Sequence, residues 1–470
     1  MAPQPTPASP SRSPTLTILT AFLAWKSLLL LIAVGAALVG DAYDTSGGLA
    51  LLLDAGGRGL ANQSGGDARL GSGLGAGSGL ARLGRELVAR LSSWDAVYFV
   101  AAAKRGYRFE QEWAFGAGLP VVVRALLGGV EHFSLVGPHT TAADQGGAVP
   151  QALAAIAVSN TAHLLSSLVL YSLGHVVWRD HTLSLVAALL HVLSPAGLFL
   201  SAPYAESSFA LLSFTGYLLF ALGCRADSRP FRRDSLTVLA GVLFGLATAF
   251  RSNGILNGIP FAYEAVRHLP RLTSRPLDTT RRLLALGVGG VCVAAGSLGP
   301  QLAAWLRFCS GASGTPPAAR PWCRGYLPSI YAFVQSHYWN TGFLRYWTTP
   351  NIPLFLLAAP MLTVLIVSGA HHLTGRLPLP AAGDAKPAEA ARLAALVRSA
   401  AATQVLLAVL AFTSYHVQII TRLSSAYPLW YWWVAALLAR GDKMGGRAVV
   451  FMVVYACVQG ALFTSFLPPA

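Results

Sequence analysis

Charged residues are scarce in this sequence. They make up 11% of its 470 residues, against roughly a quarter in an ordinary soluble domain, while 54% of the residues are hydrophobic. The mean hydropathy is +0.54. This composition excludes a soluble globular enzyme, a disordered protein and a coiled coil, and it predicts a protein embedded in the membrane.

Cysteines and acidic residues are also few. Five cysteines cannot frame a disulfide-rich secreted domain of this length. Acidic residues number 19 against 34 basic ones, which gives a net charge of +15. The arginines lie between apolar runs, and no basic stretch alternates with exposed stacking aromatics, so we expect no nucleic-acid partner. The basic stretches instead indicate loops that face the cytosol.

Apolar runs of membrane-spanning length recur along the whole chain. A spanning helix needs ~20 mostly apolar residues. Residues 429–438 are shorter, 257–265 are too short, and 119–130 are interrupted by Arg124. We therefore expect an all-α polytopic membrane protein with about ten or eleven transmembrane helices, of which the first is an uncleaved signal anchor. The better candidates are residues 16–39, 152–177, 182–200, 207–222, 236–250, 283–306, 352–370, 393–412 and 449–466.

The basic segments between the apolar runs predict which side of the membrane each connection faces. Placing residues 225–233, 267–282, 376–392 and 440–447 in the cytosol leaves the polar connections on the lumenal face. The predicted organisation is a cytosolic tail and anchor (1–40), a large first lumenal loop (41–150), transmembrane helices with short lumenal turns (151–308), a lumenal loop (309–350) and C-terminal transmembrane helices (351–470). Asn62 begins a glycosylation sequon in the first loop, which gives mild support.

The first lumenal loop has two distinct parts. Residues 46–79 are rich in glycine, alanine and serine without periodicity, which is typical of a flexible linker. Leucines at positions 80, 83, 87 and 91 then share one helical face, with arginines opposite, which predicts an interfacial helix on the membrane.

Polar and aromatic residues collect on the presumed lumenal side. Ionisable groups at membrane depth are costly and usually mark a functional site. Structural alternatives exist for several of them. Asp95 could be an N-cap, Glu206 could cap its turn or pair with Arg251, the tryptophans could be interfacial belt residues, and the polar residues after position 415 could link helices. Their common side predicts an active site at the membrane–lumen boundary, built from Trp94, Asp95, Glu110, Glu206, Arg251, Asn253, Trp339, Asn340, His416, Gln418 and Arg422.

These residues occur in short motifs whose order and spacing resemble the GPI mannosyltransferase 2 (PIG-V type) family. The similarity covers roughly residues 85 to 435. The chain departs from the family at Phe115-Gly-Ala-Gly-Leu-Pro120, where the family tends to have Phe-Phe-Pro-Gly-Phe-Pro. The motifs are Leu91-Ser-Ser-Trp94-Asp95, Gly106-Tyr107-x-x-Glu110, Ser194-Pro195-Ala196, Tyr204-x-Glu206-Ser207, Arg251-Ser-Asn-Gly254, Pro321-Trp322-Cys323, Tyr338-Trp339-Asn340-x-Gly342-Phe343 and His416-Val-Gln418 with Thr421-Arg422.

The resemblance implies a GT-C glycosyltransferase of the endoplasmic reticulum membrane. Such an enzyme takes mannose from dolichyl-phosphate-mannose and adds the second mannose, α1,6-linked, to the GPI glycolipid precursor. A β-linked donor and an α-linked product require inversion, and hence one carboxylate to take the acceptor's proton. We expect Asp95 to be this base, Arg251, Arg422 and His416 to stabilise the leaving phosphate, and Trp94 and Trp339 to stack on sugars.

The remaining candidates bind substrate in this interpretation, and no cofactor or metal is required beyond the lipid-linked donor. The expected partners are membrane lipids, the donor, the GPI precursor and a small accessory membrane subunit. Cys309 and Cys323 are expected to form a disulfide in an oxidising lumen. The alternatives are another GT-C transferase with a dolichol-linked donor, a non-catalytic membrane subunit, and a transporter, against which the absence of an internal repeat argues.

Overall fold

The computed structural model describes residues 13–40, 79–128, 147–310, 320–326, 328–375 and 387–465. Asn62 and most of the glycine-rich segment lie outside these residues. Within them every regular element is helical, as expected, and there is no β-strand. Eight helices are long and apolar enough to cross a membrane: α1 (Pro14–Val39), α6 (Val149–Trp178), α8 (Glu206–Arg225), α9 (Pro230–Phe250), α11 (Pro276–Phe308), α13 (Ile352–Leu373), α14 (Pro387–Thr413) and α17 (Lys443–Ser465).

Proline marks where many of these helices begin. A proline lies in the first turn of α1, α6, α9, α11 and α13. At that position the missing N–H costs no helical hydrogen bond, and the fixed φ already suits a helix. The shortest long helix, α8, has 20 residues and therefore spans about 30 Å, the thickness of a bilayer's hydrocarbon core.

Shorter helices complete the path. The apolar helices α7 (His181–Val192) and α16 (Pro428–Ala439) have 12 residues each. The segment after Arg251 is broken into η5 (Ser252–Gly258) and α10 (Ile259–His268). The described residues thus hold eight helices long enough to span, fewer than the ten or eleven expected, because α7 and α16 are each only about 18 Å long. The described part of the interrupted stretch, residues 119–128, does not span, because α5 (Gly118–Leu126) has only nine residues, or about 14 Å.

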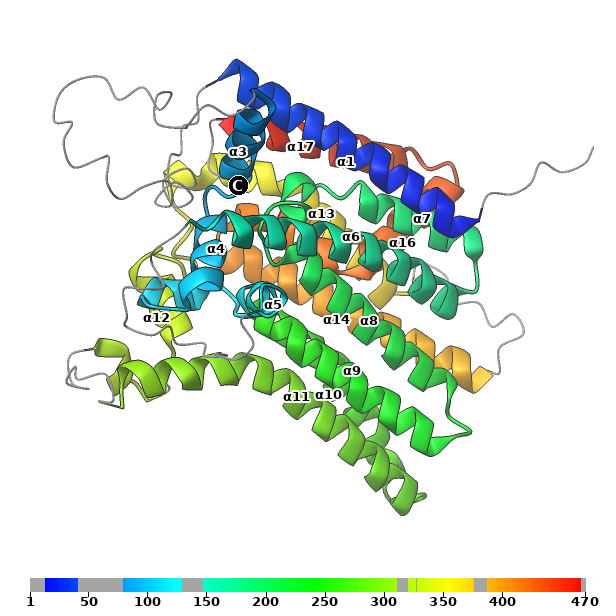
Figure 1. Cartoon of the computed structure of the whole chain (residues 1–470). Coiled ribbons are helices and arrows are strands. Elements are labelled where there is room, and N and C mark those ends of the chain that lie inside the picture. Colours follow the sequence, from blue (N-terminus) through cyan, green and yellow to red (C-terminus); the bar gives the residue numbers. More distant parts are fainter. Residues whose placement is uncertain are drawn as a thin grey trace, which may run out of the picture.

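The long helices pack in a layered bundle in which α1 lies beside α17 and α11 forms the opposite edge (Figure 1). Glycines allow α9 and α11 to approach closely. A Cβ added to Gly241 would lie 2.4 Å from the Cα of Gly289, and one added to Gly245 would lie 2.3 Å from the carbonyl oxygen of Cys292. Small residues of this kind let helix backbones pack where no hydrophobic effect drives helices together in lipid.

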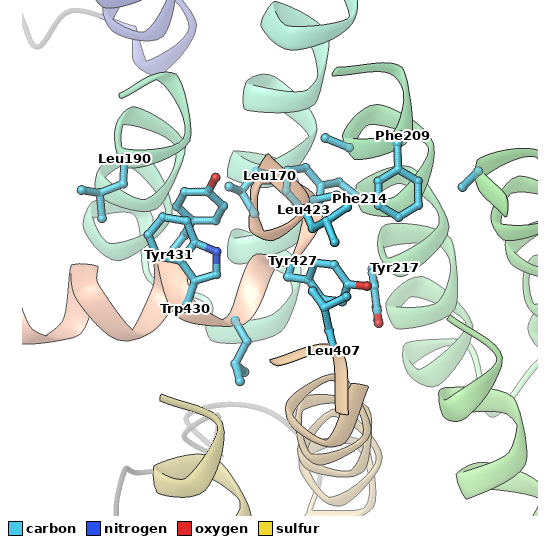
Figure 2. Close-up of a cluster of buried hydrophobic side chains, with 14 of the residues drawn as sticks. Leu170, Leu190, Phe209, Phe214, Tyr217, Leu407, Leu423, Tyr427, Trp430 and Tyr431 are labelled. Atoms are coloured by element: carbon cyan, nitrogen blue, oxygen red, sulfur yellow. The ribbon is translucent and has the colours of Figure 1, made fainter. Parts of the chain in front are cut away.

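The core lies where α16 meets its neighbours. Figure 2 shows Tyr427, Trp430 and Tyr431 among side chains from α6, α7, α8 and α14. Trp430 donates to the Ser424 carbonyl oxygen at 2.9 Å, and Tyr431 donates to that of Ser425 at 3.2 Å. These bonds satisfy the polar ends of buried aromatic rings and fix the short helices α15 (Ile420–Leu423) and η11 (Ser424–Ala426).

The two ends of the bundle differ in chemistry. α9 begins at an arginine-rich connection, residues 225–233, and ends at Phe250 and Arg251, which line a cavity. Its 21 residues place these ends about 30 Å apart. The remaining helices near the cavity are α3 (Gly79–Leu91), α4 (Ala96–Arg105), η1 (Glu110–Ala114) and α12 (Ile330–His337).

Candidate active site

A cavity of about 270 Å³ opens at one end of the bundle. Its walls come from segments far apart in the sequence, which the helix ends bring together. It gathers many of the residues predicted to form the site, namely Asp95, Arg251, Asn253, Trp339, His416, Gln418 and Arg422, and adds Phe99, Phe115, Phe250, Tyr331, Gln335 and Tyr415.

The segment that carries Asp95 is held by Arg90 at the end of α3. The Arg90 guanidinium is buried and donates to the carbonyl oxygens of Gly40 and Thr464, at 2.8 Å each. These carbonyls lie at the C-terminal ends of α1 and α17, where a cation is favoured by the helix dipole. Arg90 therefore links the end of α3 to the first and the last long helix of the chain, α1 and α17.

Trp94 turns away from the cavity. Its φ of 61° lies in the left-handed region, and its indole donates to the Phe463 carbonyl oxygen of α17 at 3.2 Å. The expected stacking of Trp94 on a sugar thus has no support from its position, since it does not line the cavity. The change in backbone direction leaves the next residue, Asp95, facing inward.

Asp95 occupies the N-cap position of α4 but does not cap it. Its side chain makes no hydrogen bond to the first turn, and a carboxylate oxygen instead accepts from Arg422 Nη1 at 3.2 Å. Asp180 shows the contrast, because its carboxylate accepts from the Leu183 backbone N–H at 3.0 Å and caps α7. The Asp95 side chain is 41% exposed, so a molecule in the cavity can reach it.

Two arginines face the cavity and share one carboxylate. Arg251 Nη1 lies 2.5 Å from Glu206 Oε1, and Arg422 Nε lies 2.8 Å from the same oxygen. Glu206 was expected to touch substrate, but its side chain is fully buried behind the arginines and does not line the cavity. The alternative that pairs Glu206 with Arg251 is correct but incomplete, because Glu206 also pairs with Arg422.

Charge states follow from this arrangement. Burial alone would lower the pKa of Arg422, but Glu206 and Asp95 outweigh it and raise that pKa above its ordinary value. Burial also lowers the pKa of His416, and the nearby Asp95 only partly opposes it. The lowered pKa favours the neutral His416 ring near pH 7, in which it can accept or donate a hydrogen bond.

Several polar atoms of the wall lack partners. Among the described residues, Arg251 Nε and Gln418 Oε1 are buried without a hydrogen bond. Such groups cost free energy unless a ligand or water satisfies them. Arg251 and Gln418 both line the cavity, so one unsatisfied donor and one unsatisfied acceptor belong to its wall.

Phe115 lies at the centre of the aromatic part of the wall. It stacks on Tyr98 at 4.5 Å between ring centroids and meets the edge of Trp339 at 5.6 Å. The next residue, Gly116, contacts the backbone at the end of α9, and a Cβ there would lie 2.0 Å from the Phe250 carbonyl oxygen. Only glycine allows this approach, which accounts for the first glycine where the chain departs from the family pattern.

Tyr331 and Gln335 were missed by the sequence reasoning. Both lie on α12 and are four residues apart, so they share one side of this helix, and Trp339 follows at the same interval just beyond its end. That spacing was a readable signal once Trp339 was a candidate. Tyr415 was also missed, and it directly precedes His416.

Glu110 and Asn340 lie away from the cavity lining. Glu110 pairs with Arg320 and accepts from the Trp322 indole at 2.9 Å, so it links η1 to the segment after α11. Asn340 is exposed in a turn with a φ of 48°. Cys309 and Cys323 form a disulfide that closes the same region, with a Cα–Cα distance of 5.6 Å. No group of three or more metal-ligating side chains occurs among the described residues.

Comparison with known proteins identifies relatives along nearly the whole chain. The family model described as Mannosyltransferase (PIG-V) matches residues 73–470. A protein of Chaetomium globosum named GPI mannosyltransferase 2 is 61% identical over 97% of this chain and 96% of its own length. One of the same name from Gibberella zeae is 44% identical over 97% and 98%.

A solved structure also aligns. The crystal structure of the Archaeoglobus fulgidus oligosaccharyltransferase, tethered to an acceptor peptide, matches 78% of this chain and 48% of its own. The sequence identity is 13% and the TM-score is 0.40.

Proposed function

Since the chain belongs to the mannosyltransferase (PIG-V) family and is a mannosyltransferase of GPI-anchor biosynthesis, we propose that it adds the second mannose, α1,6-linked, to the GPI precursor. The donor in this proposal is dolichyl-phosphate-mannose, and the anomeric carbon is inverted. The membrane is that of the endoplasmic reticulum, and the cavity faces its lumen. The observation that carries the proposal is the meeting of one accessible carboxylate and two arginines in one cavity.

Asp95 is the general base in this mechanism. Inversion requires the acceptor hydroxyl to attack the anomeric carbon from the face opposite the leaving phosphate, through an oxocarbenium-like transition state. The hydroxyl must lose its proton as the new bond forms, and Asp95 is the accessible carboxylate of the cavity lining. The C–O bond to phosphate breaks at the same time, and the electron pair leaves with the phosphate.

Arg251 and Arg422 hold the phosphate. Phosphate leaves as an anion without a general acid, but its developing charge needs fixed donors. Both guanidinium groups face the cavity, and Arg251 Nε still has a hydrogen bond to give. Arg422 also contacts Asp95, so the phosphate and the base lie on either side of one guanidinium.

The aromatic wall supports the sugar. Phe115 and Trp339 offer apolar faces near the polar groups, and Gln418 Oε1 offers an acceptor for a sugar hydroxyl. This pairing of aromatic faces with a few placed polar groups is typical of small-molecule sites.

The experiment compares Asp95→Asn with Asp180→Asn in cells or microsomes that lack this enzyme. Asparagine keeps the size and polarity of Asp95 but cannot take a proton, so we expect second-mannose transfer to fall ~10² to 10⁴-fold. Asp180→Asn retains a capping side chain and should transfer mannose as the wild type does. A folded Asp95→Asn protein with near-wild-type turnover would remove Asp95 as the base, and wild-type protein that fails to restore the second mannose would remove the proposed function.

A further inference from the structure

Glu206 is the most enclosed charged group near the cavity. It is the first residue of α8, and its side chain is 0% exposed. One oxygen, Oε1, serves both arginines, at 2.5 Å to Arg251 and 2.8 Å to Arg422. Among the described residues, the other oxygen, Oε2, has no hydrogen-bond partner. A carboxylate that only stabilised the fold would be expected to use both oxygens, because burying an unsatisfied one is costly.

The backbone around Glu206 is fixed from several sides. The Leu200 carbonyl oxygen accepts from Lys26 Nζ at 3.2 Å and from the Ser207 hydroxyl at 3.0 Å. The Tyr204 carbonyl oxygen accepts from the Ser159 hydroxyl at 3.3 Å. The turn before α8 is thereby tied to α1 and α6, so the position of Glu206 is set independently of any substrate.

Arg422 is divided between two carboxylates. Its Nε points to Glu206 and its Nη1 to Asp95, while its plane covers the rings of Phe199 and Tyr204, whose centroids lie 4.3 and 4.8 Å from Cζ. The two ring centroids are only 5.0 Å apart, so both rings lie on the same side of the guanidinium, which the two carboxylates hold at its edges. Arg422 is therefore not free to turn fully onto Asp95.

Glu206 offsets one of the two positive charges that lie near Asp95. The charged and titratable groups that face it are Arg422 of α15, Arg251 at the end of α9, His416 before η10, Tyr98 of α4, Tyr204 before α8, and Glu206 behind the arginines. The tyrosines and His416 are neutral near pH 7, so the groups around Asp95 carry two positive charges and one negative charge, and the charge of Asp95 itself brings the sum to zero.

We propose that Glu206 is a positioning residue that holds Arg251 and Arg422 side by side for a phosphate and, by offsetting part of the Arg422 charge, keeps Asp95 strong enough as a base. This inference rests on the proposed function, because it assigns Glu206 a role in that reaction. An arginine that attracts the phosphate also weakens a neighbouring base, because its positive charge stabilises the ionised carboxylate. In this proposal Glu206 reduces that second effect of Arg422 without removing the first.

Glu206→Gln tests the electrostatic part. Glutamine has the same size and an oxygen that can still accept from the arginines, but it removes one negative charge. Arg422 then stabilises ionised Asp95 more strongly, so the acidic limb of the kcat–pH profile should move about one unit lower. We expect kcat to fall roughly tenfold, since a weaker base transfers the proton less readily, while the donor KM does not rise.

Glu264→Gln is the matched control. Glu264 is also buried and also joins two basic partners, Arg267 at 2.9 Å and His268 at 3.1 Å, on the short helix α10 away from the cavity. Glu264→Gln should show any loss of stability that follows from removing a buried carboxylate, but the acidic limb of its kcat–pH profile should lie at the wild-type pH. An unmoved limb in Glu206→Gln, or an equal shift in Glu264→Gln, would overturn the proposal.

Glu206→Asp covers the case in which Glu206→Gln does not accumulate as folded protein. Aspartate keeps the charge but withdraws the carboxylate from the arginines by one methylene. The acidic limb of the kcat–pH profile should then lie at the wild-type pH while the donor KM rises. A shifted acidic limb with an unchanged donor KM would refute the role of Glu206. An inactive Asp95→Asn protein beside an unshifted Glu206→Gln profile would remove only the role of Glu206 and leave the proposed function standing.

Discussion

His416 enters the cavity wall as an uncharged ring. Burial lowers its pKa below the ordinary value of 6.5, and Asp95 offsets only part of that effect. Between the lower pKa of the folded state and the ordinary value of 6.5, His416 is therefore protonated in the unfolded chain but neutral in the folded chain. Folding is favoured by His416 above about pH 6.5, and this contribution is lost as the pH falls through the lower pKa of the folded state.

This sign gives a pH prediction. The thermal unfolding midpoint of the wild type should fall more steeply between pH 7 and pH 5 than that of His416→Gln, because glutamine has no proton to take up. His337→Gln replaces an exposed histidine on α12 and should follow the wild-type slope. Parallel curves for the wild type and His416→Gln, measured in the same detergent, would contradict the buried neutral ring.

Single residues were predictable where the cost of burying charge marked them. Asp95, Arg251 and Arg422 stand out as ionisable groups at the ends of apolar segments, and all three line the cavity. The direction of Trp94 was not predictable, because it depends on a left-handed backbone that no local pattern requires. Nor was the burial of Glu206, since its second partner, Arg422, lies 216 residues further along the chain.

The position of the short helix α12 depends on contacts made by the segments that flank it. This helix has only eight residues, and it supplies Tyr331 and Gln335 to the cavity. Ser329 caps its first turn, and the Cys309–Cys323 disulfide joins the end of α11 to the segment that precedes α12. The apolar periodicity that predicted the long helices says little about so short an element, whose place is set by contacts between loops.

Removing the disulfide should therefore loosen this wall. Closing a loop of 14 residues is worth about 3 kcal/mol on chain-entropy grounds, so Cys323→Ser should lower the unfolding midpoint and raise the donor KM. Cys457→Ser removes a cysteine that forms no disulfide and should do neither. Mass spectrometry of unreduced protein should find Cys323 protected from alkylation, and ready alkylation there would refute the bridge.

At the scale of the whole molecule, the prediction of an all-helical, multi-pass membrane protein is confirmed. Length and composition suffice for this, because only a helix satisfies its own backbone hydrogen bonds in lipid. The convergence of helix ends on one cavity required the structure, since its lining combines residues between Asp95 and Leu423 through contacts that no sequence period encodes.

The two chemically different ends of the bundle should face opposite sides of the membrane. Arg271 lies just before α11, whose 33 residues extend about 50 Å toward the cavity end that holds Trp339. An impermeant thiol reagent should label Trp339→Cys only from the lumenal side and Arg271→Cys only from the cytosolic side. Replacing the cysteines at 224, 292 and 457 removes background labelling. Labelling of both positions from one side would refute this topology.

The contacts of Arg90 with Gly40 and Thr464 also bear on the order in which the chain is synthesised. The contact of Arg90 with the Thr464 carbonyl joins residues 374 positions apart, and ribosomes add about 5 to 20 residues per second, so the two partners are made roughly 20 to 75 s apart. Every residue that lines the cavity precedes α17, yet α17 supplies the carbonyl groups that hold Arg90 and Trp94. A nascent chain halted before residue 443 would therefore carry the complete set of cavity residues but lack the two carbonyl groups of α17 that hold Arg90 and Trp94.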